Sequence, residues 1–142
     1  DMRVADETAT FGVYCRRWGV PLIDGGTIML PRLIGHSRAM DLILTGRSVD
    51  ANEAHSIGLV NRLVDKGSAR QEAEELAERI ASFPQQCVVS DRNSAISQWG
   101  MGWNEALLNE YNLGKSVMGR AKDGAARFEW GAGRGGNFQD YK

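Results

Sequence analysis

Cysteine, histidine and an excess of one charge are all scarce in this sequence. Cys15 and Cys87 stand far apart, and neither His36 nor His55 has a partner at ligand spacing, which argues against a metal site and favours free thiols in a reducing cytoplasm. Seventeen basic residues face eighteen acidic ones, for a net charge of −1, which argues against a nucleic-acid partner. No apolar run approaches the roughly 20 residues of a membrane helix. We therefore expect a cytoplasmic protein without a metal, a nucleic-acid partner or a membrane segment.

The bulk composition is that of an ordinary globular chain. It has 142 residues, of which 42% are hydrophobic and 25% charged, and this predicts one domain with one core. The chain begins at Asp1 rather than at a methionine. A processed product, an engineered polypeptide or a fragment would all begin in this way.

Helical periodicity dominates the chain. We expect short strands and helices over these residues: strands 2–5 and 59–64, a glycine-rich loop 19–26, helices 38–44 and 51–58, and helices 69–83, 88–99 and 103–118. Ser37 is expected to cap the helix whose buried stripe is Met40, Ile43 and Leu44. Asp50 followed by Glu53 resembles a capping box. One or two lone strands do not close a sheet, so either they are minor or their partners lie in other polypeptide.

Two side chains and one glycine run are candidates for function. Asp24 lies in an apolar, glycine-rich stretch, where it is either a turn or capping residue or a functional carboxylate. Cys15 precedes Arg16 and Arg17, whose charges would favour a thiolate, although a lone cysteine is more often a small core residue. The G-x-G-x-x-G match at 131–136 lacks a following helix, so we interpret it as part of a glycine-rich tail.

Five motifs occur in a recognisable order. They are Phe11-Gly12, Gly25-Gly26-Thr27, "LPRLIG" at 30–35, "LTG" at 44–46, and Glu53-Ala54 followed by "GLVN" at 58–61. In order and spacing the sequence resembles the crotonase superfamily, the enoyl-CoA hydratase/isomerase family. The resemblance covers most of the chain.

The resemblance implies an α/β fold of the crotonase type, a spiral of ββα units followed by a helical C-terminal region. This chain would be the mostly helical C-terminal half. Residues 1–66 would end the spiral core and carry an active-site loop over 11–35. Residues 67–142 would form a helical region of the trimerisation or lid type, with a glycine-rich tail over 131–142. Members of the family assemble as trimers or hexamers, so we expect a homo-oligomer.

The resemblance also implies a substrate and a chemistry. Family members bind acyl-CoA thioesters, and two backbone N–H groups hold the thioester oxygen as it becomes an enolate. Carboxylates then move protons or activate water; CoA is part of the substrate, and no further cofactor is expected. The matched segment starts after the first half of the family domain. We therefore expect the oxyanion donors and the first catalytic glutamate to come from a separate N-terminal half, without which the chain is inactive.

Residue roles follow from the same alignment of motifs. The second glutamate of the hydratases falls at Cys15, and a thiol does not replace a carboxylate that positions water. Dienoyl-CoA isomerases carry a catalytic aspartate where this chain has Asp24, and partial burial among its neighbours would suit proton transfer. The substrate-binding residues would be Trp18, Gly19, Pro21, Leu22, Ile23 and Gly25. The alternative is a non-catalytic, crotonase-like oligomerisation or interaction module.

Overall fold

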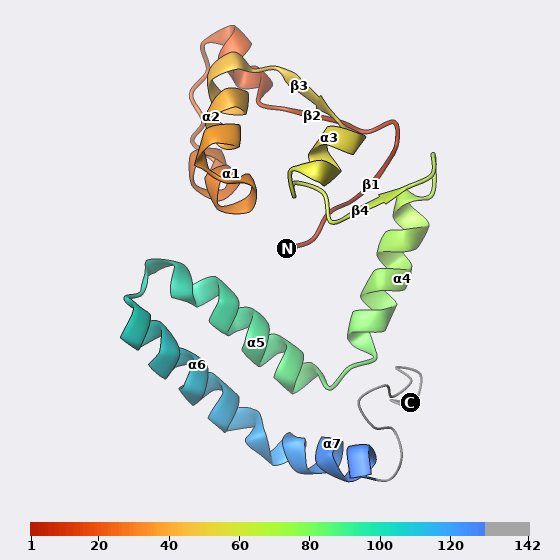
Figure 1. The fold of residues 1–142 in the computed structure, drawn as a ribbon, viewed down its shortest axis with the longest axis vertical. Coiled ribbons are helices and arrows are strands. Elements are labelled where there is room, and N and C mark those ends of the chain that lie inside the picture. The colour runs from red at the N-terminus through yellow and green to blue at the C-terminus, as the bar shows by residue number, and fades with distance from the viewer. Residues whose placement is uncertain (130–142) are drawn as a thin grey trace. The chain divides into compact units, whose positions relative to one another are not determined.

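A computed structural model describes residues 1–129 of the chain. The chain divides into two compact units, Asp1–Leu76 and Ala77–Lys142, which are described separately below (Figure 1). The predicted glycine-rich tail over 131–142 lies outside the described residues. Within the described residues, no helix is long and apolar enough to cross a membrane.

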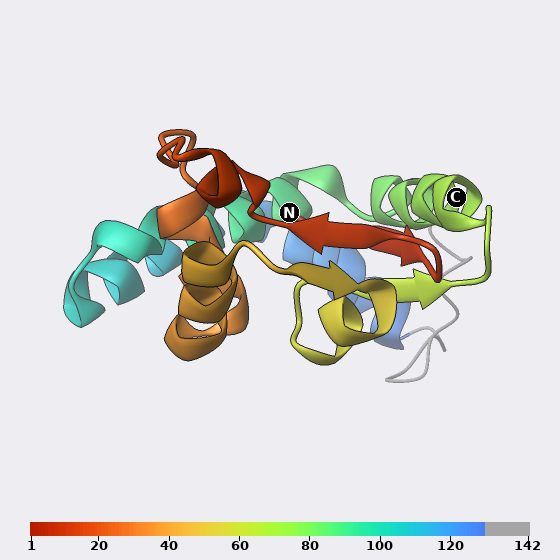
Figure 2. The ribbon, with the colours of Figure 1, turned by 90° about the horizontal axis from the view of Figure 1, so that it is seen from above.

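Four short strands of the first unit form two pairs. They are β1 (Val4–Asp6), β2 (Thr10–Gly12), β3 (Ser48–Asp50) and β4 (Arg62–Val64). β1 pairs with β4 in parallel, with Ala5 opposite Leu63, and β2 pairs with β3 antiparallel, with Phe11 opposite Val49. Figure 2 shows β1 and β2, in red, beside the yellow and yellow-green arrows of β3 and β4. The predicted strands at 2–5 and 59–64 therefore exist, in shorter and slightly later forms.

Glycines mark several helix boundaries in the first unit. They are the 3₁₀ turn η1 (Tyr14–Trp18), α1 (Gly26–Ile34), α2 (His36–Thr45), α3 (Ala51–Ser56) and the start of α4 (Ala69–Ala81). Gly35 alone separates α1 from α2, with φ at 84°, in the region that favours glycine. The predicted cap at Ser37 is wrong, because α2 begins at His36, two residues before the predicted start, and Gly35 occupies its N-cap without a side-chain cap bond.

The face that α2 buries also differs from the prediction. Ala39, Leu42 and Ile43 are buried, whereas Leu44 is 62% exposed. Residues three and four apart share a helix face, so the face through Ala39, Leu42 and Ile43 leaves Leu44 about 100° further round. The apolar pattern alone allowed either face.

The hydrophobic core of the first unit collects around α2 and the strands. Its buried members are Ala5, Ile34, Ala39, Leu42, Ile43, Val49, Ala54, Leu59 and Val60, with Phe11, Leu22 and Leu30 among the half-buried residues packed on them. Every member lies between residues 5 and 60. The single core expected from the chain length is therefore confined to this unit.

The second unit continues α4 and adds a helical hairpin. Its further elements are α5 (Gln85–Ser97), η2 (Gln98–Gly100), α6 (Trp103–Val117), η3 (Met118–Arg120) and α7 (Ala121–Arg127). α5 and α6 pack antiparallel against each other (Figure 1), so the helices predicted from periodicity are present. α6 buries no residue of its own, and its Trp103, Leu107, Leu108 and Tyr111 are exposed.

Candidate functional site

Cys15 lies in the 3₁₀ turn η1, directly after strand β2. Its side chain is half-buried and unpaired, and it is absent from the buried core, so the alternative of a small core residue does not hold. The neighbouring Tyr14 hydroxyl donates to Ser48 Oγ at 3.2 Å, which ties the start of η1 to β3. Arg17 lies over the Tyr14 ring, 5.0 Å from its centre, a distance at which a cation is attracted to the ring.

The two arginines after Cys15 anchor the turn to the end of α2. Arg16 Nε donates to the carbonyl of Ile43 at 3.4 Å, and Arg17 Nε donates to the carbonyl of Gly46 at 2.9 Å. The last carbonyls of a helix have no partner inside the helix, so they are available as acceptors here. The sequence suggested these arginines as neighbours of a thiolate; in the structure their Nε groups bind the backbone of α2 and its cap.

Asp24 lies in the loop between η1 and α1, and its carboxylate is exposed. The loop starts at Gly19, with φ at 68°, and ends at Gly25, with φ at 90°. Gly25 is the N-cap of α1, and α1 receives no side-chain cap bond. The capping alternative for Asp24 therefore fails, and among the described residues its carboxylate makes no hydrogen bond or ion pair.

The apolar wall expected around Asp24 is only partly formed by the described residues. Leu22 is half-buried and packs on the core, but Trp18 is 81% exposed and Ile23 is 90% exposed. Pro21 is exposed as well. The expected partial burial of the Asp24 carboxylate is thus corrected for this chain: its apolar neighbours point outward and leave it in solvent.

The structure places all the predicted site residues on one continuous segment, 14–25. The amide of Val20 donates to the carbonyl of Cys15 at 3.1 Å, which joins the Cys15 turn to the start of the loop that carries Asp24. The predicted substrate-binding residues occupy the intervening turn and loop; they are Trp18, Gly19, Pro21, Leu22, Ile23 and Gly25. Within residues 1–129, no group of three or more metal-ligating side chains occurs.

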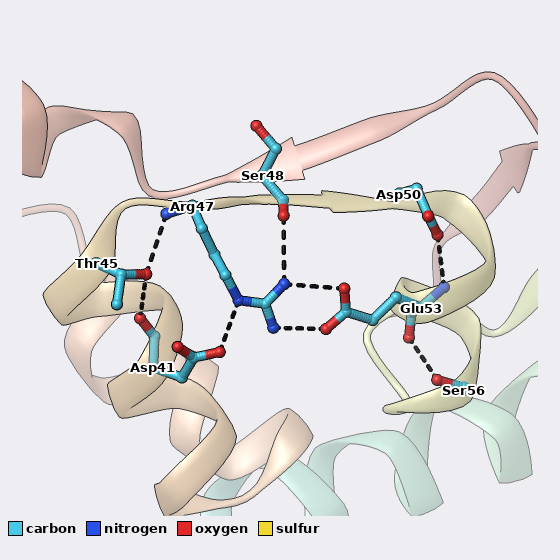
Figure 3. A network of polar contacts seen from close by, with 7 residues as sticks. All are labelled: Asp41, Thr45, Arg47, Ser48, Asp50, Glu53 and Ser56. Atoms are coloured by element: carbon cyan, nitrogen blue, oxygen red, sulfur yellow. Dashed lines mark hydrogen bonds and ion pairs between the residues drawn. The ribbon is translucent and has the colours of Figure 1, made fainter.

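Sequence reasoning missed Arg47, which forms the largest polar network near this segment (Figure 3). Arg47 donates from Nε to Asp41 at 2.7 Å, and its two terminal nitrogens bind Glu53 at 2.9 and 2.5 Å. These hydrogen bonds, Glu53 first, raise the pKa of Arg47 above its ordinary value, and the same bonds lower the pKa of Glu53. A planar guanidinium matches two carboxylate oxygens at once, so the pairing also fixes the orientation of Glu53.

The Arg47 network joins three elements next to η1. Asp41 belongs to α2 and Glu53 to α3, while Arg47 itself also donates to the carbonyl of Ser48 in β3 at 3.3 Å. The Asp50 carboxylate accepts from the Glu53 amide at 2.8 Å, which confirms Asp50 as the helix cap. Its partner in the predicted box, the Glu53 side chain, binds Arg47 instead.

The Asp6 carboxylate accepts a separate group of hydrogen bonds in the first unit. Asp6, at the end of β1, accepts from the amide and hydroxyl of Thr8 at 2.9 and 2.6 Å and from the Gly67 amide at 3.0 Å. These bonds, with that of the Thr8 hydroxyl first, lower the pKa of Asp6. The turn after β1 is thereby connected to the loop after β4.

Two pairs of short strands with α3 packed on them, and a glycine-bounded loop leading into the helix pair α1 and α2, make this unit an α/β chain. A family model described as enoyl-CoA hydratase/isomerase matches residues 1–123. The chain is 34% identical to the enoyl-CoA hydratase EchA19 of Mycobacterium tuberculosis over 142 residues, covering 99% of this chain and 53% of that protein. The chain belongs to the enoyl-CoA hydratase/isomerase family.

Solved structures agree with this assignment. The crystal structure of an enoyl-CoA hydratase from Bacillus anthracis superposes with a TM-score of 0.85 at 32% identity, covering 91% of this chain and 51% of that one. An enoyl-CoA hydratase from Mycobacterium tuberculosis superposes with a TM-score of 0.86 at 31% identity, covering 91% and 52%. The expected crotonase-like α/β fold is confirmed, and the chain spans about half the length of the relatives it matches.

Proposed function

We propose that this chain is the mostly helical C-terminal half of an acyl-CoA-processing enzyme, with Asp24 as its acid/base. The observation that carries the proposal is the state of Asp24. Its carboxylate is exposed and has no hydrogen bond or ion pair among the described residues, although it lies in a loop between two anchored elements. A carboxylate that caps no helix and balances no cation is available for proton transfer.

The residue at position 15 favours proton transfer over hydration. A hydratase of this family needs a second glutamate to position water, and Cys15 occupies that place in the motif spacing. A single carboxylate at Asp24 suffices to take a proton from one carbon of an enolisable thioester and return it to another. We therefore propose an isomerase-type reaction through an enolate, with an acyl-CoA thioester as substrate.

The exposed side chains around Asp24 suit one wall of an acyl site. Trp18 and Ile23, six residues and one residue before Asp24, present large exposed apolar side chains, and Gly19 and Gly25 have no atom within 4 Å of the position that a Cβ would take. An acyl chain approaching this segment would meet apolar side chains and open backbone.

The rest of the site would come from the part of the family domain that this chain does not span. The relatives are about twice as long as the matched region, and each sheet among the described residues has only two strands. Small sheets of this kind are marginal without further strands or covering helices. We propose that the oxyanion donors come from this remaining half, whether it belongs to the same polypeptide or to another, and that the whole forms a homo-oligomer.

Turnover of an enoyl-CoA substrate tests the proposal. The chain is assayed together with the remaining half of the family domain, fused to it or added as a second polypeptide, and isomerisation and hydration are measured separately. We expect isomerisation that falls at least about 100-fold in Asp24→Asn, while Asp65→Asn, an exposed carboxylate of the same unit, leaves it unchanged. We expect no turnover by the 142 residues alone. Equal activity of the two variants would refute the role of Asp24.

The exposed face of α6 favours a second candidate function, a non-catalytic oligomerisation or interaction module. Trp103, Leu107 and Tyr111 repeat at intervals of four residues and are exposed, so they lie on one side of the helix. Exposed apolar surface of this kind marks a protein contact. A stable oligomer by light scattering, together with no binding of CoA or acyl-CoA by calorimetry, would favour this function over the enzyme.

A further inference from the structure

The turn that carries Cys15 rests on the C-terminal end of α2 without an intervening side chain. Gly46, the residue that ends α2, has φ at 61° and lies against η1. A Cβ at Gly46 would lie 3.3 Å from the carbonyl oxygen of Val13, 3.4 Å from Arg16 Cβ and 3.5 Å from Arg17 Cγ. The missing side chain therefore lets the turn approach the helix end closely.

Two hydrogen bonds hold η1 against the end of α2. Arg17 Nε donates to the Gly46 carbonyl at 2.9 Å and Arg16 Nε to the Ile43 carbonyl at 3.4 Å. The Arg17 guanidinium also lies over the Tyr14 ring, 5.0 Å from its centre, so a second contact restricts its orientation. Arginine loses less freedom than lysine on such binding, because its planar group is already oriented.

The C-terminal end of α2, to which Arg16 and Arg17 bind, is itself held by side-chain hydrogen bonds. Arg47 follows Gly46 and is bonded to Asp41 within α2 and to Glu53 in α3. The end of α2 is thus fixed to β3 and α3 on one side, and it offers its free carbonyls to η1 on the other. Movement of η1 relative to the core requires loss of the arginine bonds.

The same turn holds the start of the Asp24 loop. The Gly19 amide donates to the Arg16 carbonyl at 3.3 Å, and the Val20 amide donates to the Cys15 carbonyl at 3.1 Å. Gly19 and Val20, the first two residues of the loop, are therefore bonded to the backbone of η1.

We propose that Arg17, assisted by Arg16, is a positioning residue: it sets the place of the Cys15 turn and, through it, the start of the Asp24 loop. The consequence for catalysis rests on the proposed function, but the anchoring itself does not. Arg17 acts through the backbone and is not proposed to touch substrate.

Hydrogen exchange of single amides tests the anchoring without any activity. In Arg17→Gln we expect the Val20 amide to exchange at least about tenfold faster, whereas the Val60 amide, bonded to Ala54 in the core, keeps its rate. Arg17→Lys, which keeps a donor and the charge, should recover part of the protection. Arg38→Gln is the matched control, since Arg38 is an exposed arginine of α2 with no bond among the described residues.

Steady-state kinetics of the completed enzyme tests the consequence. We expect kcat of Arg17→Gln to fall about tenfold with KM changed less than about twofold, because a small misplacement of a reacting group slows the chemical step more than it weakens binding. Unchanged Val20 exchange, or equal acceleration at Val20 and Val60, would overturn the anchoring. If Val20 exchanges faster in Arg17→Gln but the wild-type enzyme turns over no acyl-CoA, the anchoring stands and the proposed function is refuted.

Discussion

Replacement of Gly46 by alanine tests how tightly η1 is seated on α2. Two effects add at this position. A residue with a Cβ in the left-handed region loses about 1–2 kcal/mol relative to glycine, and Gly46 has φ at 61°. The new methyl group would also meet Val13, Arg16 and Arg17 at 3.3 to 3.5 Å, one of these contacts being with a backbone oxygen, which cannot rotate away. Only the contact with the Val13 oxygen is tighter than an ordinary van der Waals contact, so we expect crowding to add a cost at the low end of the range for overpacking, about 1 kcal/mol.

Gly19→Ala is the matched control for the conformational effect alone. Gly19 has φ at 68° and nothing within 4 Å of its Cβ position, so its substitution should destabilise by about 1–2 kcal/mol only. Urea unfolding of both variants measures the difference in their free energies of unfolding, provided that the dependence of that free energy on urea concentration is the same for both. We expect Gly46→Ala to be the less stable by about 1 kcal/mol. If the two variants unfold at the same urea concentration, η1 is not closely seated on α2 and the reasoning about Arg17 loses its basis.

Two further predictions concern the core and the response to acid. Val49→Ala should destabilise the chain by about 2 kcal/mol, because it removes two fully buried carbon groups and leaves a cavity, whereas Leu44→Ala on the exposed side of α2 should change stability by less than about 0.5 kcal/mol; urea unfolding compares them. In the folded chain the pKa values of Asp6 and Glu53 lie below their ordinary values of 3.8 and 4.5. The two carboxylates therefore stabilise the fold fully at a pH above these ordinary values, and this stabilisation is lost as the pH falls through their folded-state pKa values. The unfolding midpoint should therefore be constant from pH 7 to about 5 and decline below about 4, and Asp6→Asn should reduce that decline; an equally steep decline in the variant would contradict the role of Asp6.

Much of the fold was accessible from local patterns in the sequence. The helices over 69–81 and 103–117 follow from apolar residues three and four apart. The cap at Asp50 follows from the capping-box pattern, an aspartate three residues before Glu53, whose amide it accepts. These interactions join residues within one turn of a helix, so the sequence displays both partners side by side. The family motifs added the position of Asp24 and the crotonase-like fold.

The tertiary structure alone decided which residues hold the candidate site. Arg17 binds a carbonyl 29 residues away and Arg16 one 27 residues away, and nothing in the local pattern around Cys15 indicates either acceptor. The buried face of α2 also depends on tertiary packing: α2 packs on α1, and Leu42 joins the core cluster with Ile34 and Val49, whereas Leu44 stays exposed. The sequence by itself determined the helices, the cap and the family, because these depend on neighbouring residues and on motif order. The anchoring of η1, the Arg47 network and the exposure of Asp24 depend on segments that meet only after folding, when free backbone carbonyls and charged side chains find their partners.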